Sequence, residues 1–338
     1  MRPVVGGSTV FGVSPQAFSL RRPARTRPFI GKLIAFSVFF LVVFMVCFSV
    51  QTVWPFFGQE IVVIRSQDLP LYQQVMDGFK KVYKGPFKEI DLKGDPKEFE
   101  KQIVSLKKNP PALVITIGLF ASRIVQERLS GTPMLFCMVF DPERFNLSGR
   151  NITGVALDVP VSELFSQIKK ILPNAKTGGV LYDPKKTGRG IREAQKAAQA
   201  QGLALISEKV DSKKMVPTAL RSLLNKVDFL WMIPDSTVIT EESVDFILLT
   251  SFENNIPIVT FSEDIVKRGA VLAVVPDYAA LGEQVGQLAQ RIFTGESADR
   301  IPIQSLEKVR FSVNLKTAKK MGILLNTEEI SSADKIDD

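Results

Sequence analysis

Histidine is absent from the 338-residue chain. This absence excludes imidazole acid–base catalysis, Ser-His-Asp triads and HExxH zinc sites. The two cysteines are Cys47, in a long apolar segment, and Cys137, in a strand-like run, so we expect neither a disulfide between them nor a cysteine-rich zinc site. No Walker A sequence occurs, so the chain is not itself an ATPase. These absences predict a protein without metal, cofactor or catalytic activity, although carboxylates and lysines remain available for chemistry.

Acidic residues are missing from the first 59 positions, which carry six basic side chains. The net charge of the whole chain is +8, whereas the remaining 279 residues hold 37 basic and 35 acidic side chains. The high pI is therefore a property of the N-terminal segment. The rest of the chain has a mixed surface charge, which does not favour a nucleic-acid-binding face.

Residues 33–57 contain the long apolar run, of which the first 18 residues, Leu33 to Val50, carry no charge. This segment is long enough to cross a bilayer. The basic residues before it predict a cytoplasmic N-terminus, residues 1–32, and an exported remainder. A cleaved signal peptide is the alternative, but no clear A-x-A site is present. We therefore expect a transmembrane anchor or signal segment and a soluble domain in the periplasm, anchored to the inner membrane.

From Glu60 onward, apolar strand-like runs alternate with amphipathic helices. The stretches that begin at Ala112 and Asp228 share one order: buried strand, turn, helix, a break at proline, buried strand, acidic loop. This repeat predicts an α/β protein with two Rossmann-like lobes, whose parallel sheets are covered on both faces. Ligands of such sheets bind outside the carboxyl ends of the strands.

Several stretches in order resemble a known family. They include LVITIGLFAS, NITGVALDVP, VDFLWMIPDSTV and NNIPIVTFSEDIVKRGAVLAVVPDYAALGEQVGQLAQRIFTGE, between Ile61 and about Gly322. The chain resembles the ABC-transporter substrate-binding family that includes tryptophan- and tyrosine-type amino-acid binders, with the type I periplasmic binding protein fold. The resemblance implies two lobes joined by three crossings, a small-molecule cleft, and an ABC permease with its ATPase as partners. The apparent anchor departs from the family, most of whose members are cleaved or lipidated.

The late strands and helices are expected to finish both lobes. We expect the first lobe to comprise residues 58–150 with 277–300, and the second to comprise 151–276 with 301–325. Residues 326–338 are expected to form a flexible tail.

The first-lobe ligand site is expected at the turn from Gly118 to Ser122, which joins a buried strand to a helix. Free N–H groups at a helix N-terminus favour an anion, so a ligand carboxylate fits there, with the Ser122 hydroxyl adding a bond. A plain tight turn with Ser122 as a cap is the alternative. The expected ligand-binding residues of this lobe are Ser66, Gln67, Tyr72, Gly118, Phe120, Ala121, Ser122 and Asp141.

The second-lobe site is expected at Asp235-Ser236-Thr237, where Asp235 would pair with a ligand ammonium and the hydroxyls would orient it. A helix-capping turn is the alternative. Asp183, like Asp141, precedes proline and also suits a turn, and Asp277 also suits a helix N-cap. The expected ligand-binding residues of this lobe and the crossing near it are Asp183, Asp235, Ser236, Thr237 and Asp277.

These features favour the extracytoplasmic solute-binding component of an ABC importer. It would capture an amino acid or related zwitterion between the lobes by hinge closure. An apolar solute or a sugar stays open as the ligand. A membrane-tethered sensing or accessory module that signals to a partner protein is the alternative function. An enzyme using carboxylates is disfavoured, because it would need paired acids with a nucleophile or a metal.

Overall fold

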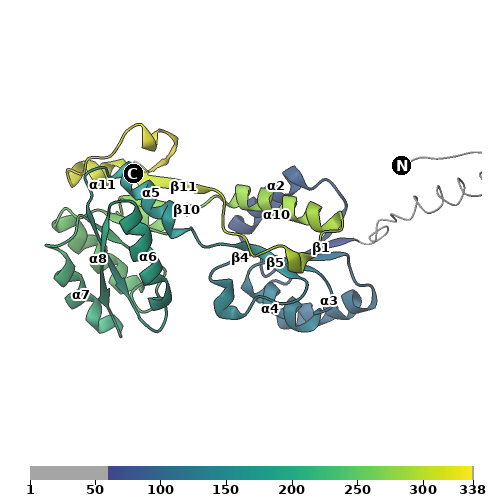
Figure 1. Ribbon diagram of the computed structural model, residues 1–338. Helices are drawn as coiled ribbons and strands as arrows, with labels where there is room; N and C mark the ends of the chain where they lie inside the picture. The colour runs from purple at the N-terminus through teal and green to yellow at the C-terminus, as the bar shows by residue number, and fades with distance from the viewer. Residues whose placement is uncertain (1–59, 337–338) are drawn as a thin grey trace, which may run out of the picture. The chain divides into compact units, whose positions relative to one another are not determined.

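The computed structural model describes residues 60–336 of the chain (Figure 1). The predicted membrane segment, residues 33–57, and Cys47 within it lie outside this range. Among the described residues, no helix combines the length and the apolar character needed to cross a bilayer. The structure is an α/β fold with two sheets, each of which forms the centre of one lobe.

The first sheet has five strands in the order β2-β1-β3-β4-β5, and every neighbouring pair is parallel. Its inner strands are short apolar runs without alternation, as expected for a sheet buried on both faces. The strands are β1 (Ile61–Arg65), β2 (Phe87–Asp91), β3 (Leu113–Ile117), β4 (Met134–Val139) and β5 (Ile152–Ala156).

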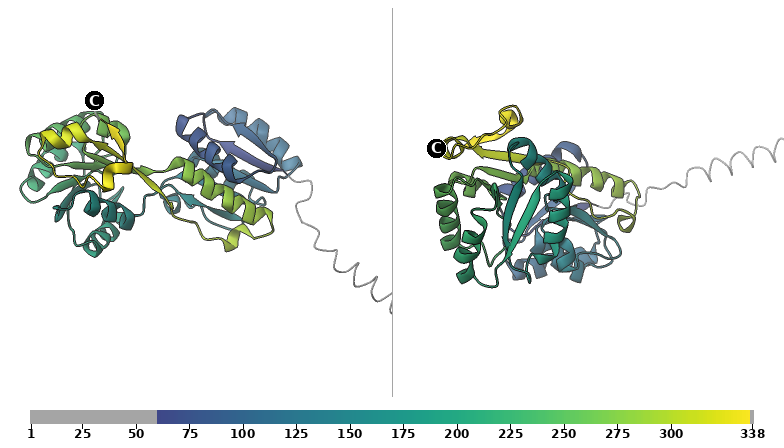
Figure 2. Two further views of the ribbon diagram at one scale, coloured as in Figure 1. Left: turned by 90° about the horizontal axis from the view of Figure 1, so that it is seen from above. Right: turned by 60° about the vertical axis from the view of Figure 1, so that its left-hand side comes forward.

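Helices cover both faces of the first sheet. The helices α2 (Pro70–Val82) and α10 (Tyr278–Phe293) lie side by side on one face (Figures 1 and 2). The helices α3 (Pro96–Lys108) and α4 (Leu119–Arg128) lie on the other (Figure 1). Each face has its own hydrophobic core, and the α10 residues join the core of the α2 face.

The second sheet has the order β12-β11-β10-β9-β8-β6-β7. Its five strands from β6 to β10 pair in parallel, β11 is antiparallel to β10, and β12 is parallel to β11. The strands are β6 (Thr177–Tyr182), β7 (Ala204–Lys209), β8 (Phe229–Trp231), β9 (Ile258–Thr260), β10 (Leu272–Pro276), β11 (Val309–Asn314) and β12 (Asp334–Ile336).

The second sheet is also covered on both faces, by α5 and α6 on one and by α7 and α8 on the other (Figure 1). The short helices α9 and α11 follow β9 and β11, and α9 was not expected from the sequence. The remaining helices are α5 (Val161–Ile171), α6 (Gly188–Ala200), α7 (Val216–Leu223), α8 (Glu241–Glu253), α9 (Glu263–Lys267), α11 (Leu315–Lys320) and the 3-10 turns η1 (Pro142–Phe145), η2 (Lys213–Met215), η3 (Ala298–Arg300) and η4 (Glu329–Ser332).

The chain passes between the two sheets three times: after β5, after β10 and after α10. Sheet membership differs from the expected lobe boundaries at two places. β5 pairs with β4 in the first sheet, although residue 151 onward was expected in the second lobe. Gln304 also bonds to the backbone of β5, because its N–H donates to the Gly154 carbonyl at 2.8 Å, although residues 301–325 were expected in the second lobe.

The chain end differs from the expected flexible tail over residues 326–338. β12 extends the second sheet beside β11, and Ile330 of η4 is buried in that lobe's core. The Asn326 N–H also donates to the Ile171 carbonyl at 3.0 Å. The chain end forms a strand here because the open edge of β11 offers unpaired backbone groups to a following segment.

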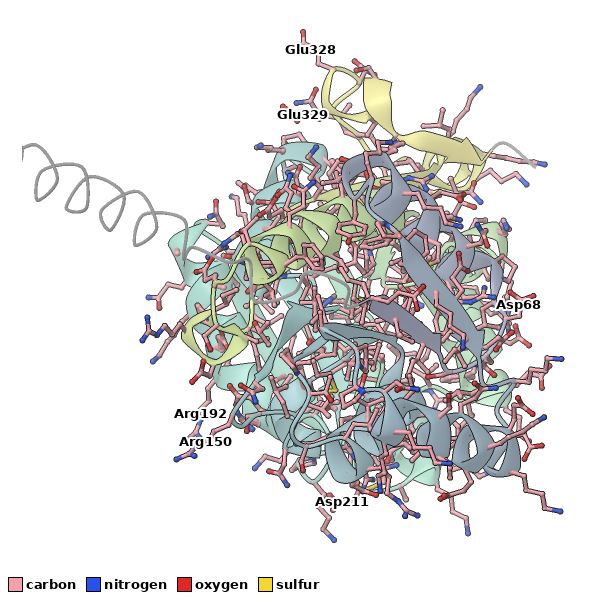
Figure 3. The ribbon with its side chains drawn as sticks, turned by 90° about the vertical axis from the view of Figure 1, so that its right-hand side faces the viewer. Asp68, Arg150, Arg192, Asp211, Glu328 and Glu329 are labelled. Carbon is pink, nitrogen blue, oxygen red and sulfur yellow. The ribbon has the colours of Figure 1, made fainter. Side chains whose placement is uncertain are left out.

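Charged side chains of both signs project from the described surface, as Figure 3 shows for Asp211, Arg192 and Glu328. This distribution agrees with the mixed solvated surface expected for the residues after the N-terminal segment. The polar residues that the sequence predicts for a ligand site lie elsewhere, at the carboxyl ends of the strands.

Candidate functional site

Ser66, Gly118 and Asp141 follow the ends of β1, β3 and β4, which are neighbours in the first sheet. Because the strands are parallel, these residues lie along one edge of the sheet, where open α/β sheets bind ligands. The predicted first-lobe residues therefore share one region of the fold. Whether they contact a ligand stays a prediction.

Gly118 is required by its surroundings as well as by its backbone. Its φ is 95°, and a Cβ there would lie 2.3 Å from the Tyr72 hydroxyl and 2.7 Å from the Ser66 Oγ. A larger side chain would have to displace both hydroxyl groups, and L-residues rarely adopt this φ. The glycine thus brings the strand end and the start of α4 close to two hydroxyl groups.

The Ser66 hydroxyl stabilises the first turn of α4. It donates to the Ile117 carbonyl at 3.0 Å and accepts from the Ala121 N–H at 3.0 Å. Burial raises the pKa of Tyr72, the nearby Cys137 thiol adds to the rise, and a hydrogen bond with Ser66 opposes it. Ser66 and Tyr72 are thus buried neutral groups beside the turn, and Ala121 supplies a backbone donor that is already used.

The Ser122 hydroxyl points into the protein. It donates to the Gly118 carbonyl at 2.8 Å and shares a hydrogen bond of 2.9 Å with Thr116, and the residue is 0% exposed. The Leu119 and Phe120 N–H groups have no acceptor among residues 60–336. The anion-binding capacity of this turn therefore lies in those two backbone donors. Phe120 is half-buried and Gln67 is exposed.

Asp141 lies in a left-handed conformation with φ of 41°, just after β4. Its carboxylate accepts from the Arg144 N–H at 3.2 Å, and its own N–H donates to Asp158 at 2.8 Å. Burial raises the pKa of Asp158, although this hydrogen bond opposes the rise. Asp141 is therefore a turn-forming cap in this structure, which was the alternative that its proline neighbour suggested.

Asp183 and Asp235, which follow β6 and β8, hold two loops together. The Asp183 N–H donates to Asp235 Oδ2 at 2.8 Å, and Thr187 Oγ1 donates to the same oxygen at 2.5 Å. Thr237 Oγ1 in turn donates to Asp183 Oδ2 at 2.7 Å. We call these four residues the aspartate clasp.

Asp235 is satisfied entirely by the protein. Its second oxygen, Oδ1, accepts from the N–H groups of Thr237 at 2.8 Å and Val238 at 3.4 Å, and the residue is 0% exposed. Hydrogen bonds from the Thr237 hydroxyl and the Lys185 N–H lower the pKa of Asp183. Donors of the chain therefore occupy the carboxylate that the sequence suggested for a ligand ammonium. The exposed Ser236 accepts from Lys186 Nζ at 2.8 Å.

Asp277 caps α10, because its Oδ1 accepts from the Ala280 N–H at 2.9 Å. The next residue, Tyr278, is half-buried. Burial is the main reason that the pKa of Tyr278 is raised; the carboxylate of Glu263 adds to the rise and the cation of Arg310 opposes it. Tyr278 therefore lies near charged side chains of both signs at the end of β10.

The sequence analysis did not single out Arg65, which ends β1 at the same edge of the first sheet as Ser66. Its side chain is only 13% exposed, and its Nη1 lies 3.0 Å from Asp68. A charged residue that ends an otherwise apolar strand was the available signal. Asp68 itself lies at the outer surface (Figure 3), so the pair is partly solvated and contributes little to stability.

Cys137 of β4 is fully buried, and burial raises its thiol pKa to about 12. A thiol with such a pKa is neutral and unreactive at neutral pH. Within residues 60–336, no three His, Cys, Asp or Glu side chains gather in a way that would hold a metal ion.

Residues 75–336 match the family described as ABC transporter substrate binding protein. The match covers more than half of the chain. The chain belongs to this family. Family members are extracytoplasmic binding proteins rather than enzymes.

One relative and two solved structures illustrate the match. A tyrosine-binding protein of Clostridioides difficile is 25% identical over 228 residues, which cover 65% of each chain. A ligand-free, open substrate-binding protein with adhesive properties from Clostridium difficile is 20% identical, with a TM-score of 0.69 over 82% of this chain and 99% of that one. An ABC domain in complex with L-Trp from Streptococcus pneumoniae is 21% identical, with a TM-score of 0.55 over 82% of this chain and 100% of that one.

The solved structures show the fold of the family, two α/β lobes with parallel sheets. The chain covers just under two thirds of the length of the tyrosine-binding protein, 65%. The relative's name includes tyrosine, and the Streptococcus pneumoniae structure is a complex with L-Trp.

Proposed function

We propose that this protein is the extracytoplasmic solute-binding component of an ABC importer and that its ligand is an amino acid or a related zwitterion. Membership of the substrate-binding family over residues 75–336 carries this proposal. A relative named for tyrosine and a solved structure whose title names L-Trp support the ligand class.

The first turn of α4 is the proposed site of the ligand carboxylate. The Leu119 and Phe120 N–H groups lack acceptors among the described residues, and the positive end of the helix dipole adds to their attraction for an anion. Ser66, Tyr72 and Gly118 shape the turn, and Ala121 is held by Ser66. In this proposal Ser122 supports the turn from inside and does not contact the ligand.

Hinge closure is the proposed mechanism. The chain crosses between its two sheets three times, so the connecting segments can bend while each sheet and its helices stay intact. A ligand that contacts both lobes binds the closed state more tightly and shifts the population toward it. The closed protein would then be recognised by a permease, whose ATPase supplies the energy that this chain does not.

Residues 33–57 are proposed to tether the protein to the inner membrane, with the binding domain in the periplasm. A tether keeps the binding domain near its permease. It equally suits the alternative, a sensing module that signals ligand closure to a membrane partner.

Thermal unfolding of the full chain in detergent, followed by intrinsic fluorescence, tests the ligand class. The panel consists of amino acids, sugars, nucleosides and small acids. A ligand at 100 times its Kd should add about 2.7 kcal/mol to the free energy of unfolding. A selective shift with an amino acid supports the proposal. No shift with any solute, or a shift with sugars alone, contradicts it.

The carboxylate site has its own test in Leu119→Pro. Leu119 is the first residue of α4, where proline is tolerated, so this substitution removes one N–H donor and keeps the helix. Leu119→Ala is the control, because it also loses the side chain but keeps the donor. We expect the proline variant to bind the amino acid about 10-fold more weakly than the alanine variant. Equal affinities would show that this turn does not hold the carboxylate.

A further inference from the structure

The strand ends of the second sheet differ in how far their polar groups are satisfied. The ends of β6 and β8 are joined by the aspartate clasp, and Asp277 after β10 accepts a backbone N–H of α10. β9 lies between β8 and β10 in the sheet. The polar side chains at its carboxyl end lack such partners within the described chain.

Three polar side chains at the end of β9 have no partner among residues 60–336. Thr260 is 2% exposed, and its hydroxyl makes no hydrogen bond. Ser262 stands at the N-cap of α9, yet its side chain accepts no bond from the helix. Glu263 is half-buried and forms neither a hydrogen bond nor an ion pair within the described chain.

The position of Glu263 brings it to the neighbouring crossing. β9 pairs in parallel with β10, with Thr260 opposite Ala273, so the residues that follow the two strands lie at the same sheet edge. Tyr278 begins α10 there and lies within electrostatic range of Glu263. The half-buried Glu263 and the half-buried Tyr278 therefore follow neighbouring strands at one edge of the sheet, and Arg310 of β11 also lies within electrostatic range of Tyr278.

A half-buried carboxylate without a partner is costly, and it becomes costlier if closure removes more water. A cation supplied by the ligand would remove that cost, and an aromatic ring alongside would add to the attraction. Asp235, the acid that the sequence suggested for this role, already accepts four hydrogen bonds from the chain.

We propose that Glu263 binds the ligand's ammonium group, with Tyr278 beside it, and that the acids of the aspartate clasp take no part in contacting the ligand. This assignment rests on the proposed function, since it requires a ligand with an ammonium group. It makes Glu263 a residue that selects amino acids over the corresponding acids without an amino group.

Calorimetric titration of the full chain in detergent tests the assignment. The probes are L-tyrosine and L-tryptophan, together with 3-(4-hydroxyphenyl)propionate and 3-(indol-3-yl)propionate, which lack only the ammonium group. Glu263→Gln keeps the size of the side chain and removes its charge. The matched control is Asp264→Asn, since Asp264 is the next residue of α9, also lies in its first turn, and pairs with Lys267.

We expect Glu263→Gln to weaken binding of the two amino acids by about 10-fold or more and to leave the two propionates within about 2-fold. Asp264→Asn should change neither. Without ligand, Glu263→Gln should unfold at the same temperature as the unsubstituted chain or higher, whereas a role in stabilising α9 through its dipole would lower that temperature.

Two outcomes overturn the assignment and can be told apart. If the unsubstituted chain binds L-tyrosine or L-tryptophan and Glu263→Gln binds it equally well, or loses the amino acid and the propionate alike, Glu263 does not hold the ammonium. If the unsubstituted chain binds neither amino acid while it binds the propionates or another solute, the proposed ligand class fails, and the assignment fails with it.

Discussion

Asp183 and Asp235 show how a residue at a ligand-binding edge can serve the fold instead. Each carboxylate accepts a hydrogen bond from the hydroxyl of a threonine in the other loop. The Asp183 N–H also donates to Asp235. The sequence placed both acids at strand ends correctly, as polar residues after apolar runs. It did not reveal that their oxygens are occupied, because the partners are about 50 positions away, Asp235 being 52 from Asp183.

Replacing Asp235 by alanine should destabilise the second lobe. The change removes a fully buried carboxylate and leaves its donors, which include the Asp183 N–H and the Thr187 hydroxyl, without an acceptor. We expect a loss of about 2–4 kcal/mol in the free energy of unfolding, measured by urea denaturation. The control is Ser236→Ala, since Ser236 is an exposed neighbour with one bond to Lys186. Equal stability of the two variants would contradict a structural role for the clasp.

At the scale of elements, the contact between α2 and α10 depends on glycine. A Cβ at Gly282 would lie 2.0 Å from the Val75 carbonyl oxygen, and one at Gly78 would lie 1.9 Å from the Ala279 oxygen. The obstacles are backbone atoms, so no side-chain rearrangement can relieve them. The two helices, about 200 positions apart in the chain, therefore pack backbone to backbone over the first sheet (Figure 2).

Gly282→Ala and Gly190→Ala should change stability in opposite directions. Gly282→Ala forces α10 away from α2 and should lower the free energy of unfolding by about 1–3 kcal/mol. Gly190 lies within α6, and a Cβ there meets nothing within 4 Å. Gly190→Ala should therefore raise the free energy by about 0.5–1 kcal/mol, because alanine favours the helix. Urea denaturation measures both; a Gly282→Ala variant as stable as the unsubstituted chain or more so would contradict the close contact, and a destabilised Gly190→Ala variant would contradict the propensity effect.

At the scale of the whole molecule, segments late in the chain complete both lobes. α10 covers the first sheet, while β11 and β12 extend the second. The sequence predicted late crossings of this kind, but it placed residues 301–325 in the second lobe and the chain end in a flexible tail. Residues 309–314 do lie there as β11, but the backbone bonds of Gln304 hold the start of residues 301–325 against β5, and β12 pairs with β11. Both are pairings between distant segments, which local periodicity does not encode.

Ending the chain after Leu325 should weaken the second lobe. It removes β12 from the edge of β11 and Ile330 from the core. Burying one isoleucine contributes about 1.5–3 kcal/mol, and we expect a loss of at least about 2 kcal/mol once the strand's hydrogen bonds are included. Trp231 of β8 reports unfolding of this lobe by fluorescence. Removal of residues 337–338 alone is the control, and a shortened chain as stable as that control would refute the contribution of β12.

The sequence by itself determined the fold class, most strands and helices, the family resemblance and the edge of each sheet where polar residues gather. These features follow from local patterns: apolar runs, helical periodicity and residues that begin or end helices. α9, only five residues long, escaped because it is too short for a clear period.

Only the tertiary structure decided which of those polar residues have partners. Ser66, Asp235 and Glu263 look alike in sequence, because each is a polar residue after a strand. In the fold, Ser66 and Asp235 form hydrogen bonds with other parts of the chain, whereas Glu263 forms none within the described residues. The physical reason is that a hydrogen bond depends on donors and acceptors brought together across the fold. A single strand and its following loop carry no information about what the neighbouring loop donates.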